Sequence, residues 1–250
     1  MRLSGFSLTL NFFLVGWMLL PVHARAGRPL STEDADPVGR GVVQVEIGLD
    51  HAREESRKTA LTAVLTYGLA DVLDLALELP VLFLRPEEGG SQAGAGDIEL
   101  RGKYRWLDEG PIWPAIAVLG AVKTPTGSER RGLGSGATDA AIRLVGTKEL
   151  GPVTVHLNLG YTFIGASGLD NVLSWGVAAS LKVTDAVALV GEVVGETNSD
   201  PHAKDDPREL RAGLTYALWE KVVLDGAVSV GLTRASPDYV LTVGLTARFE

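Results

Sequence analysis

The chain contains no cysteine, which excludes both a disulfide framework and a metal site built on thiolates. Basic residues are also in the minority, since the formal net charge is −8, whereas a nucleic-acid surface would be basic. Beyond residue 26 there is no apolar run of the roughly 20 residues that a transmembrane helix needs. What remains is a chain of 250 residues, 46% of them hydrophobic, which suits one large β-domain better than two.

Residues 1–26 have the pattern of an export signal peptide. Arg2 supplies the positive start, Phe6 to Leu20 is mainly apolar, and Ala24-Arg25-Ala26 forms an A-x-A cleavage site. The alternative is a single membrane anchor, but the apolar run is interrupted and short for a span. This segment holds two bases and no acid, so the mature chain would carry 21 bases against 31 acids.

The stretch from Pro152 to Phe163, PVTVHLNLGYTF, alternates strictly between apolar residues and polar residues or glycine. The apolar phase consists of Val153, Val155, Leu157, Leu159, Tyr161 and Phe163. A period of two is typical of a β-strand with one apolar and one polar face. At about 3.3 Å per residue and a tilt of about 45°, eleven residues rise roughly 26 Å, close to the apolar band of a membrane barrel.

Similar alternating segments follow one another from Val43 to Phe249. Tight turns and longer polar loops alternate between them, as do the short periplasmic turns and longer external loops of outer-membrane barrels. We therefore predict an all-β fold for residues 41–250, a transmembrane antiparallel up-and-down β-barrel of about 12 strands. Residues 27–40 are polar and contain two prolines, so we expect them to form an extended periplasmic lead-in.

Aromatic side chains gather near the predicted strand ends, most of them on the apolar phase. Those at the tight-turn end are Tyr67, Tyr104, Trp106, Trp113, Tyr216, Trp219 and Phe249, and those toward the long-loop end are Phe83, Tyr161, Phe163, Trp175 and Tyr239. Two aromatic girdles are expected where a membrane barrel meets water. The alternative is a soluble barrel with its apolar side inside, as in lipocalins, but such a core would scatter its aromatics along the strands.

Charged residues on the polar phase are the candidate lumen-lining residues. They are Glu46, Asp74, Glu78, Glu99, Arg101, Lys103, Arg105, Arg143, His156, Glu192, Glu196, Arg211, Asp225 and Arg248. An Arg or Lys at mid-depth in lipid would cost about 2–4 kcal/mol, so these side chains are expected to face the lumen. They could brace a closed barrel or line a narrow, selective pore. Arg101, Lys103 and Arg105 form a basic ladder on one strand, and we expect Glu78 beside it.

His156 is the only histidine on the polar phase, and no serine partners it in the sequence. A general base needs a partner within hydrogen-bond reach, and outer-membrane phospholipases place their Ser/His pair on the lipid-facing side. We therefore expect a lumen hydrogen bond for His156 and no enzymatic activity. The acidic loop of residues 199–206 lacks EF-hand spacing, and the glycines of residues 132–136 lack the Lys-Ser/Thr of a phosphate loop. We expect neither metal nor cofactor.

Four stretches occur in the order and spacing of one family. They are LSTEDADPVGRG from Leu30, GDIELRGKYRW from Gly96, KTPTG from Lys123 and LGSGATDA from Leu133. These stretches resemble the outer-membrane transporter family named for the meta-pathway of phenol degradation. The resemblance covers most of the mature chain and implies an outer-membrane barrel without catalytic residues. The last strand also resembles a barrel-assembly signal, T-x-G-x-x-A-x-F, although Glu250 follows the final aromatic residue.

The predicted function is that of a channel or transporter in the cell outer membrane for passive passage of small molecules, with aromatic or hydrophobic compounds as candidates. The alternative is a structural or adhesive barrel whose lumen is closed by its own ion pairs. The expected partners are outer-membrane lipid and lipopolysaccharide, the barrel-assembly machinery through the C-terminal strand, and a small-molecule solute. No nucleic-acid partner is expected.

Overall fold

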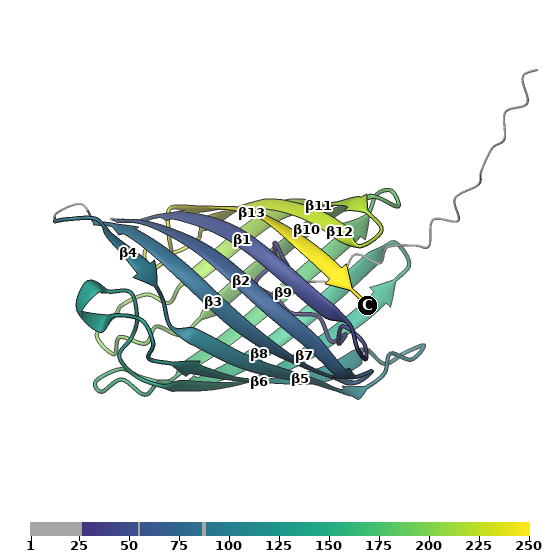
Figure 1. Cartoon of the computed structure of the whole chain (residues 1–250), viewed down its shortest axis with the longest axis horizontal. Coiled ribbons are helices and arrows are strands. Elements are labelled where there is room, and N and C mark those ends of the chain that lie inside the picture. The colour runs from purple at the N-terminus through teal and green to yellow at the C-terminus, as the bar shows by residue number, and fades with distance from the viewer. Residues whose placement is uncertain (1–26, 55, 87–88) are drawn as a thin grey trace, which may run out of the picture.

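The computed structural model describes residues 27–54, 56–86 and 89–250 and shows a β-barrel (Figure 1). The predicted signal peptide, residues 1–26, lies outside the described residues. The elements are β1 (Val43–Arg53), β2 (Arg57–Ala70), β3 (Leu73–Arg85), β4 (Gln92–Ala95), β5 (Ile98–Leu107), β6 (Ala115–Thr124), the 3-10 helix η1 (Glu129–Arg131), β7 (Asp139–Leu150), β8 (Val153–Phe163), β9 (Val172–Lys182), β10 (Val187–Glu196), β11 (Arg208–Trp219), β12 (Val222–Gly231) and β13 (Tyr239–Phe249).

The barrel closes through pairing of the first and last strands. β1 runs antiparallel to β13 in continuous register from Val43 opposite Phe249 to Arg53 opposite Tyr239. Every other wall strand pairs with its neighbours in sequence, except that β3 pairs directly with β5. β4 pairs only with residues 81–84 at the end of β3 and is a hairpin strand outside the ring. The ring therefore has 12 strands, which confirms the predicted closed up-and-down barrel.

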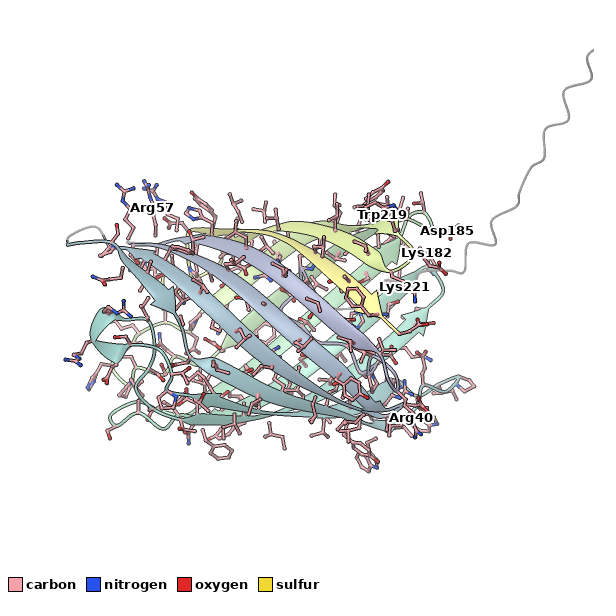
Figure 2. The ribbon with its side chains drawn as sticks, viewed as in Figure 1. Arg40, Arg57, Lys182, Asp185, Trp219 and Lys221 are labelled. Atoms are coloured by element: carbon pink, nitrogen blue, oxygen red, sulfur yellow. The ribbon has the colours of Figure 1, made fainter. Side chains whose placement is uncertain are left out.

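The two faces of the wall have the opposite polarity to a soluble barrel. In β8, the Leu157 and Leu159 side chains are 54% and 53% exposed on the outside, whereas His156 and Asn158 are 1% and 9% exposed on the inside. The same alternation holds along the other strands. This arrangement contradicts the alternative of an apolar interior and leaves a belt of apolar side chains around the outside (Figure 2).

The start of one strand differs from the prediction. Alternation in the sequence continues back to Ile112 and predicts a strand from that residue, but β6 begins at Ala115. Pro114 has no N–H to donate to the ladder, so Ile112 and Trp113 lie in the turn before the strand, where they are 80% and 66% exposed.

Residues 27–40, which we call the N-terminal plug, lie mostly inside the barrel, and Arg40 is exposed at its tight-turn end, where its N–H donates to Asp71. Thr32, Asp34 and Ala35 are at most 3% exposed, and Ala35 packs against the wall residue Val145. The plug bonds to strands on different sides of the wall, so it crosses the interior. This placement corrects the expectation of a periplasmic lead-in. A polar segment without periodicity does not predict a strand, but it can supply hydrogen-bond and ion-pair partners to the charged side chains of the lumen.

Candidate functional site: the lumen and its N-terminal plug

One ion pair of the wall holds the first part of the plug by its backbone. The Glu192 carboxylate on β10, 3% exposed, accepts the N–H of Ser31 at 2.8 Å and that of Thr32 at 2.9 Å. Arg211, directly opposite on β11, lies 3.3 Å from this carboxylate and donates to the carbonyl of Pro29 at 2.8 Å. Two predicted lumen residues therefore act together as a clamp.

Polar side chains on β7 and β8 bind the middle of the plug. The Asn158 amide oxygen accepts the N–H of Glu33, and its NH₂ group donates to the Glu33 carbonyl, both at 2.9 Å. Thr147 Oγ1 accepts the N–H of Ala35 at 2.9 Å and lies 3.1 Å from His156 Nδ1. These side chains replace the backbone partners that a neighbouring strand would offer, so the buried plug keeps its peptide groups satisfied.

The acids of the plug lie against the basic ladder of β5. Lys103 Nζ is 3.2 Å from Asp34 and 3.4 Å from Glu33, and Arg105 is 3.0 Å from Asp36. Plug carboxylates therefore occupy this ladder, and that it lines a permeation path stays a prediction. Charges in a poorly hydrated interior need such partners, so the ladder and the acidic run of the plug complement each other.

Arg101 connects the plug with the wall. Its guanidinium is 3.7 Å from Glu33 of the plug, forms a close ion pair with Glu78 on β3, and hydrogen-bonds to Glu99 on its own strand. The expectation that Glu78 lies beside the ladder is confirmed. Three carboxylates share this one guanidinium, so Arg101 links the plug, β3 and β5 through its ion pairs.

A notch made by two glycines receives Arg28. Gly48 on β1 and Gly244 on β13 are directly opposite each other, and a Cβ atom at either position would collide with the Arg28 guanidinium. In this notch, Arg28 Nη2 lies 3.5 Å from Asp225 Oδ1, and Arg28 Nη1 lies 3.7 Å from Asp50 Oδ2. Neither glycine has a positive φ, so close approach, and not backbone conformation, is what requires a glycine here.

The remaining predicted lumen residues also face the interior. Asp74 accepts the N–H of Val38 at 3.0 Å, Arg248 Nε donates to Gln44 at 2.7 Å, and Glu46 lines a cavity with Arg248. The fourteen charged positions therefore lie on the interior face of the wall. That they line a permeation path stays a prediction. Sequence reasoning missed the plug residues, whose signal was the run Glu33, Asp34 and Asp36 facing three bases on one strand.

Arg143 on β7 differs from the other interior cations. Among the described residues it has no hydrogen bond or ion pair within 4 Å, and it lines cavities of about 230 and 370 Å³. Gly160 lies directly opposite on β8, where a Cβ would be in ordinary contact with Arg143 Nε, at 3.4 Å, but would collide with Ser174 Oγ. An open cavity beside an unpaired guanidinium can bind a carboxylate.

His156 has the structural role expected from its phase. It is 1% exposed, and Thr147 is the hydrogen-bond partner of its Nδ1. In the described part of the chain, its Nε2 has no partner and no group of three or more potential ligand side chains could hold a metal ion. The pair of Thr147 and His156 is therefore part of the plug support.

The predicted aromatic girdles lie on the outer surface. Eleven of the twelve residues are between 38% exposed, for Tyr161, and 71% exposed, for Trp106. Tyr239 is half-buried, and Trp113 and Trp219 mark the tight-turn end, where Figure 2 labels Trp219. Their position at a membrane interface stays a prediction. Tyr161 and Phe163 make an edge-to-face contact at 5.0 Å.

Comparison with known proteins agrees with this geometry. The family model described as "Putative MetA-pathway of phenol degradation" matches residues 26–249. The chain belongs to this family. The match confirms the resemblance found in the four sequence stretches and spans the plug as well as the barrel. No curated protein matches the sequence.

Solved structures of outer-membrane barrels share the fold of this family member. The COG4313 outer membrane channel from Pseudomonas putida F1 is 17% identical with a TM-score of 0.72, over 88% of this chain and 100% of that chain. The KdgM porin in complex with oligogalacturonate is 12% identical with a TM-score of 0.58, over 82% and 99%. The NanC porin is 9% identical with a TM-score of 0.58, over 82% and 98%. At these identities the likeness concerns the fold.

Proposed function

We propose that this protein is an outer-membrane channel for passive diffusion of small molecules, and that the N-terminal plug constricts its lumen. The observation that carries the proposal is how the plug is held. Hydrogen bonds and ion pairs from nine wall strands bind it, and water or a polar solute can replace such contacts. An apolar plug would instead seal the lumen, because separating it would expose apolar surface to water.

The space beside the plug supports a narrow path. Cavities of about 250 Å³ near Glu46 and Asp74, and of about 370 Å³ near Arg143 and Lys123, lie against the plug on different parts of the wall. They are lined by charged residues of both signs, which keep them hydrated. A barrel of about 12 strands lies between side-chain-filled small barrels and the wide porins of 16–18 strands, so a constricted passage fits its size.

The proposed solutes are small carboxylated molecules, with aromatic acids first. Arg143 lines two of the cavities and has no ion pair within 4 Å among the described residues, and the family description refers to phenol degradation. The KdgM porin was solved with oligogalacturonate, an acidic sugar chain, in a barrel of the same fold. The chain acts as a conduit and not as an enzyme in this proposal, since His156 is committed to the plug support.

A second candidate is a structural barrel kept closed by its own ion pairs. The observation that favours it is the network of Lys103, Arg101 and the plug acids, which fills the lumen at that level. The two candidates differ in one property, because only a channel passes solute when it is embedded in a bilayer.

Solute uptake by liposomes tests the proposal. Liposomes that contain the mature protein should take up a small aromatic carboxylate faster than liposomes without protein, and Arg143→Gln should slow this uptake more than that of a neutral aromatic alcohol. Uptake at the protein-free rate for both solutes would favour the closed barrel. Equal slowing of both solutes by Arg143→Gln would reject the role of Arg143 but leave the channel in place.

A further inference from the structure

Three arginines are neighbours on the outer surface of β1, β2 and β3. Arg53 on β1 lies directly opposite Arg57 on β2, and Arg57 lies directly opposite Arg85 on β3. Residues opposite each other on adjacent antiparallel strands have Cβ atoms about 4.5–5.5 Å apart. The register therefore brings three guanidinium groups into one exposed row, and Figure 2 shows Arg57 projecting outward from this end of the barrel.

The row has the phase of the lipid-facing side chains. On β3, Phe83 is 46% exposed on the outside and lies two residues before Arg85. On β2, Leu61 is 41% exposed on the outside and lies four residues after Arg57. Residues an even number of positions apart on a strand share the same face. Two residues of a strand span about 7 Å, so Arg85 lies one step beyond the apolar belt. This is the long-loop end of the barrel, which outer-membrane proteins turn outward. In a barrel turned this way, the arginines would be at the height of the outer lipid headgroups.

Among the described residues, the row has no salt-bridge partner. In residues 27–54, 56–86 and 89–250, none of the three guanidinium groups takes part in an ion pair or a side-chain hydrogen bond. Like charges directly opposite each other on a sheet are destabilising. Each of Lys148, Lys182 and Lys221 at the other end of the barrel has a carboxylate within 3.5 Å. An external anion would relieve the repulsion among the arginines.

We infer that Arg53, Arg57 and Arg85 form a binding site for the phosphate groups of a phosphorylated glycolipid in the outer leaflet. Arginine binds phosphate in a bidentate, charge-assisted manner. The acyl chains of such a lipid would lie along the exposed apolar side chains of β1 to β3, so one molecule matches both parts of the surface. A soluble anion would use the arginines alone. This site is independent of the proposed channel, since it lies on the outside of the wall.

Binding of purified lipid A to the mature protein in detergent tests the inference. One variant replaces all three arginines with glutamine (R53Q, R57Q and R85Q). A charge-matched control replaces the three paired lysines (K148Q, K182Q and K221Q). A shift between boiled and unboiled samples on gels verifies that each protein is folded. Titration with bis-phosphorylated lipid A and with fully dephosphorylated lipid A then separates the phosphate contribution from the contribution of the acyl chains.

The expected result is that the arginine variant binds bis-phosphorylated lipid A at least tenfold more weakly than the wild type, whereas the lysine control stays within twofold. The wild type should also bind dephosphorylated lipid A at least tenfold more weakly than bis-phosphorylated lipid A. This comparison holds even if the arginine variant fails to fold. Equal affinity of the wild type for both lipids would overturn the inference. Equal loss in the lysine control, or displacement of the lipid by millimolar inorganic phosphate, would also overturn it.

Discussion

Lys103 on β5 and Asp34 of the N-terminal plug form an ion pair of 3.2 Å between the wall and a segment that precedes the first strand. Their side chains are 13% and 5% exposed. Removing one partner of a buried pair leaves the other charge uncompensated, which costs about 3–5 kcal/mol. Since the plug is not a strand of the barrel, we expect that it can leave its site while the wall stays folded. The pair should therefore control the position of the plug.

The first prediction concerns release of the plug. The chain has no cysteine, so Thr32→Cys places a single thiol in the plug at a site that is 2% exposed and makes no side-chain hydrogen bond. This thiol should react slowly with a maleimide, and adding Lys103→Gln should speed the reaction at least tenfold. Ala203→Cys in an exposed loop is the control and should react at the same rate with and without Lys103→Gln. An unchanged rate at Thr32→Cys would show that Lys103 does not hold the plug.

The second prediction separates the two faces of β8. Leu157→Arg places a charge on the lipid-facing side at a cost of about 2–4 kcal/mol, so the yield of folded barrel should fall. Asn158→Arg, one residue further, should still assemble, but it removes both hydrogen bonds to Glu33 and should loosen the plug. The ratio of folded to unfolded protein on unboiled gels measures assembly. Similar assembly defects in the two variants would mean that the faces are assigned wrongly.

The strands of the wall were predictable from the sequence because apolar and polar residues alternate along them with a period of two. The apolar phase from Val153 to Phe163 is the outer face of β8, and Glu78 lies beside Arg101 as the order of strands required. The start of β6 was less predictable, because Ile112 and Trp113 continue the alternation while Pro114 prevents their pairing. Periodicity shows which face a residue occupies, but turn geometry decides where pairing begins.

The plug was not predictable from periodicity. Its residues make contacts with partners 100 to 200 positions away, such as Asn158 with Glu33 and Arg211 with Pro29, and no local pattern records such distances. The glycine notch for Arg28 could not be predicted either, because a glycine within a strand indicates only a weak strand propensity and not a contact with a distant side chain. Complementary charge was the available signal, since an acidic run precedes a strand with three bases.

The third prediction tests the glycine notch. Gly48→Ala should displace the Arg28 guanidinium from Asp225 and Asp50, because the added Cβ would collide with it. The thiol at residue 32 described above should then react faster, while assembly of the barrel stays normal. Gly120→Ala on β6 is the matched control, since nothing lies within 4 Å of a Cβ at that position. The notch has no role if both alanine variants leave the reaction rate unchanged.

The fourth prediction concerns pH and the loop after β6. Asp97 accepts the N–H of Ser135 at 2.7 Å and of Gly127 at 2.8 Å. Burial by itself raises the pKa of Asp97, but these N–H donors outweigh it, so the pKa lies below its usual 3.8. A depressed pKa in the folded state means that the carboxylate stabilises the loop above pH 3.8 and that this contribution is lost as the pH falls through the folded pKa.

Hydrogen exchange of the Gly127 and Ser135 amides measures this effect. After correction for intrinsic rates, protection should be constant near pH 6 and should fall below pH 3.8. Asp97→Asn should lower the protection already at pH 6, whereas Asp170→Asn in another long loop should not. Protection that survives both acid and Asp97→Asn would show that other contacts hold the loop.

Single-channel recording in planar bilayers tests most directly the central claim that the plug constricts a path through the lumen. The wild-type mature protein should give a small conductance. The full-length variant with Glu33→Gln, Asp34→Asn and Asp36→Asn loses the plug charges that face Lys103, Arg101 and Arg105, and its conductance should be at least twice that of the wild type. A folded wild type and a folded variant that are both silent, or that conduct equally, would contradict the account.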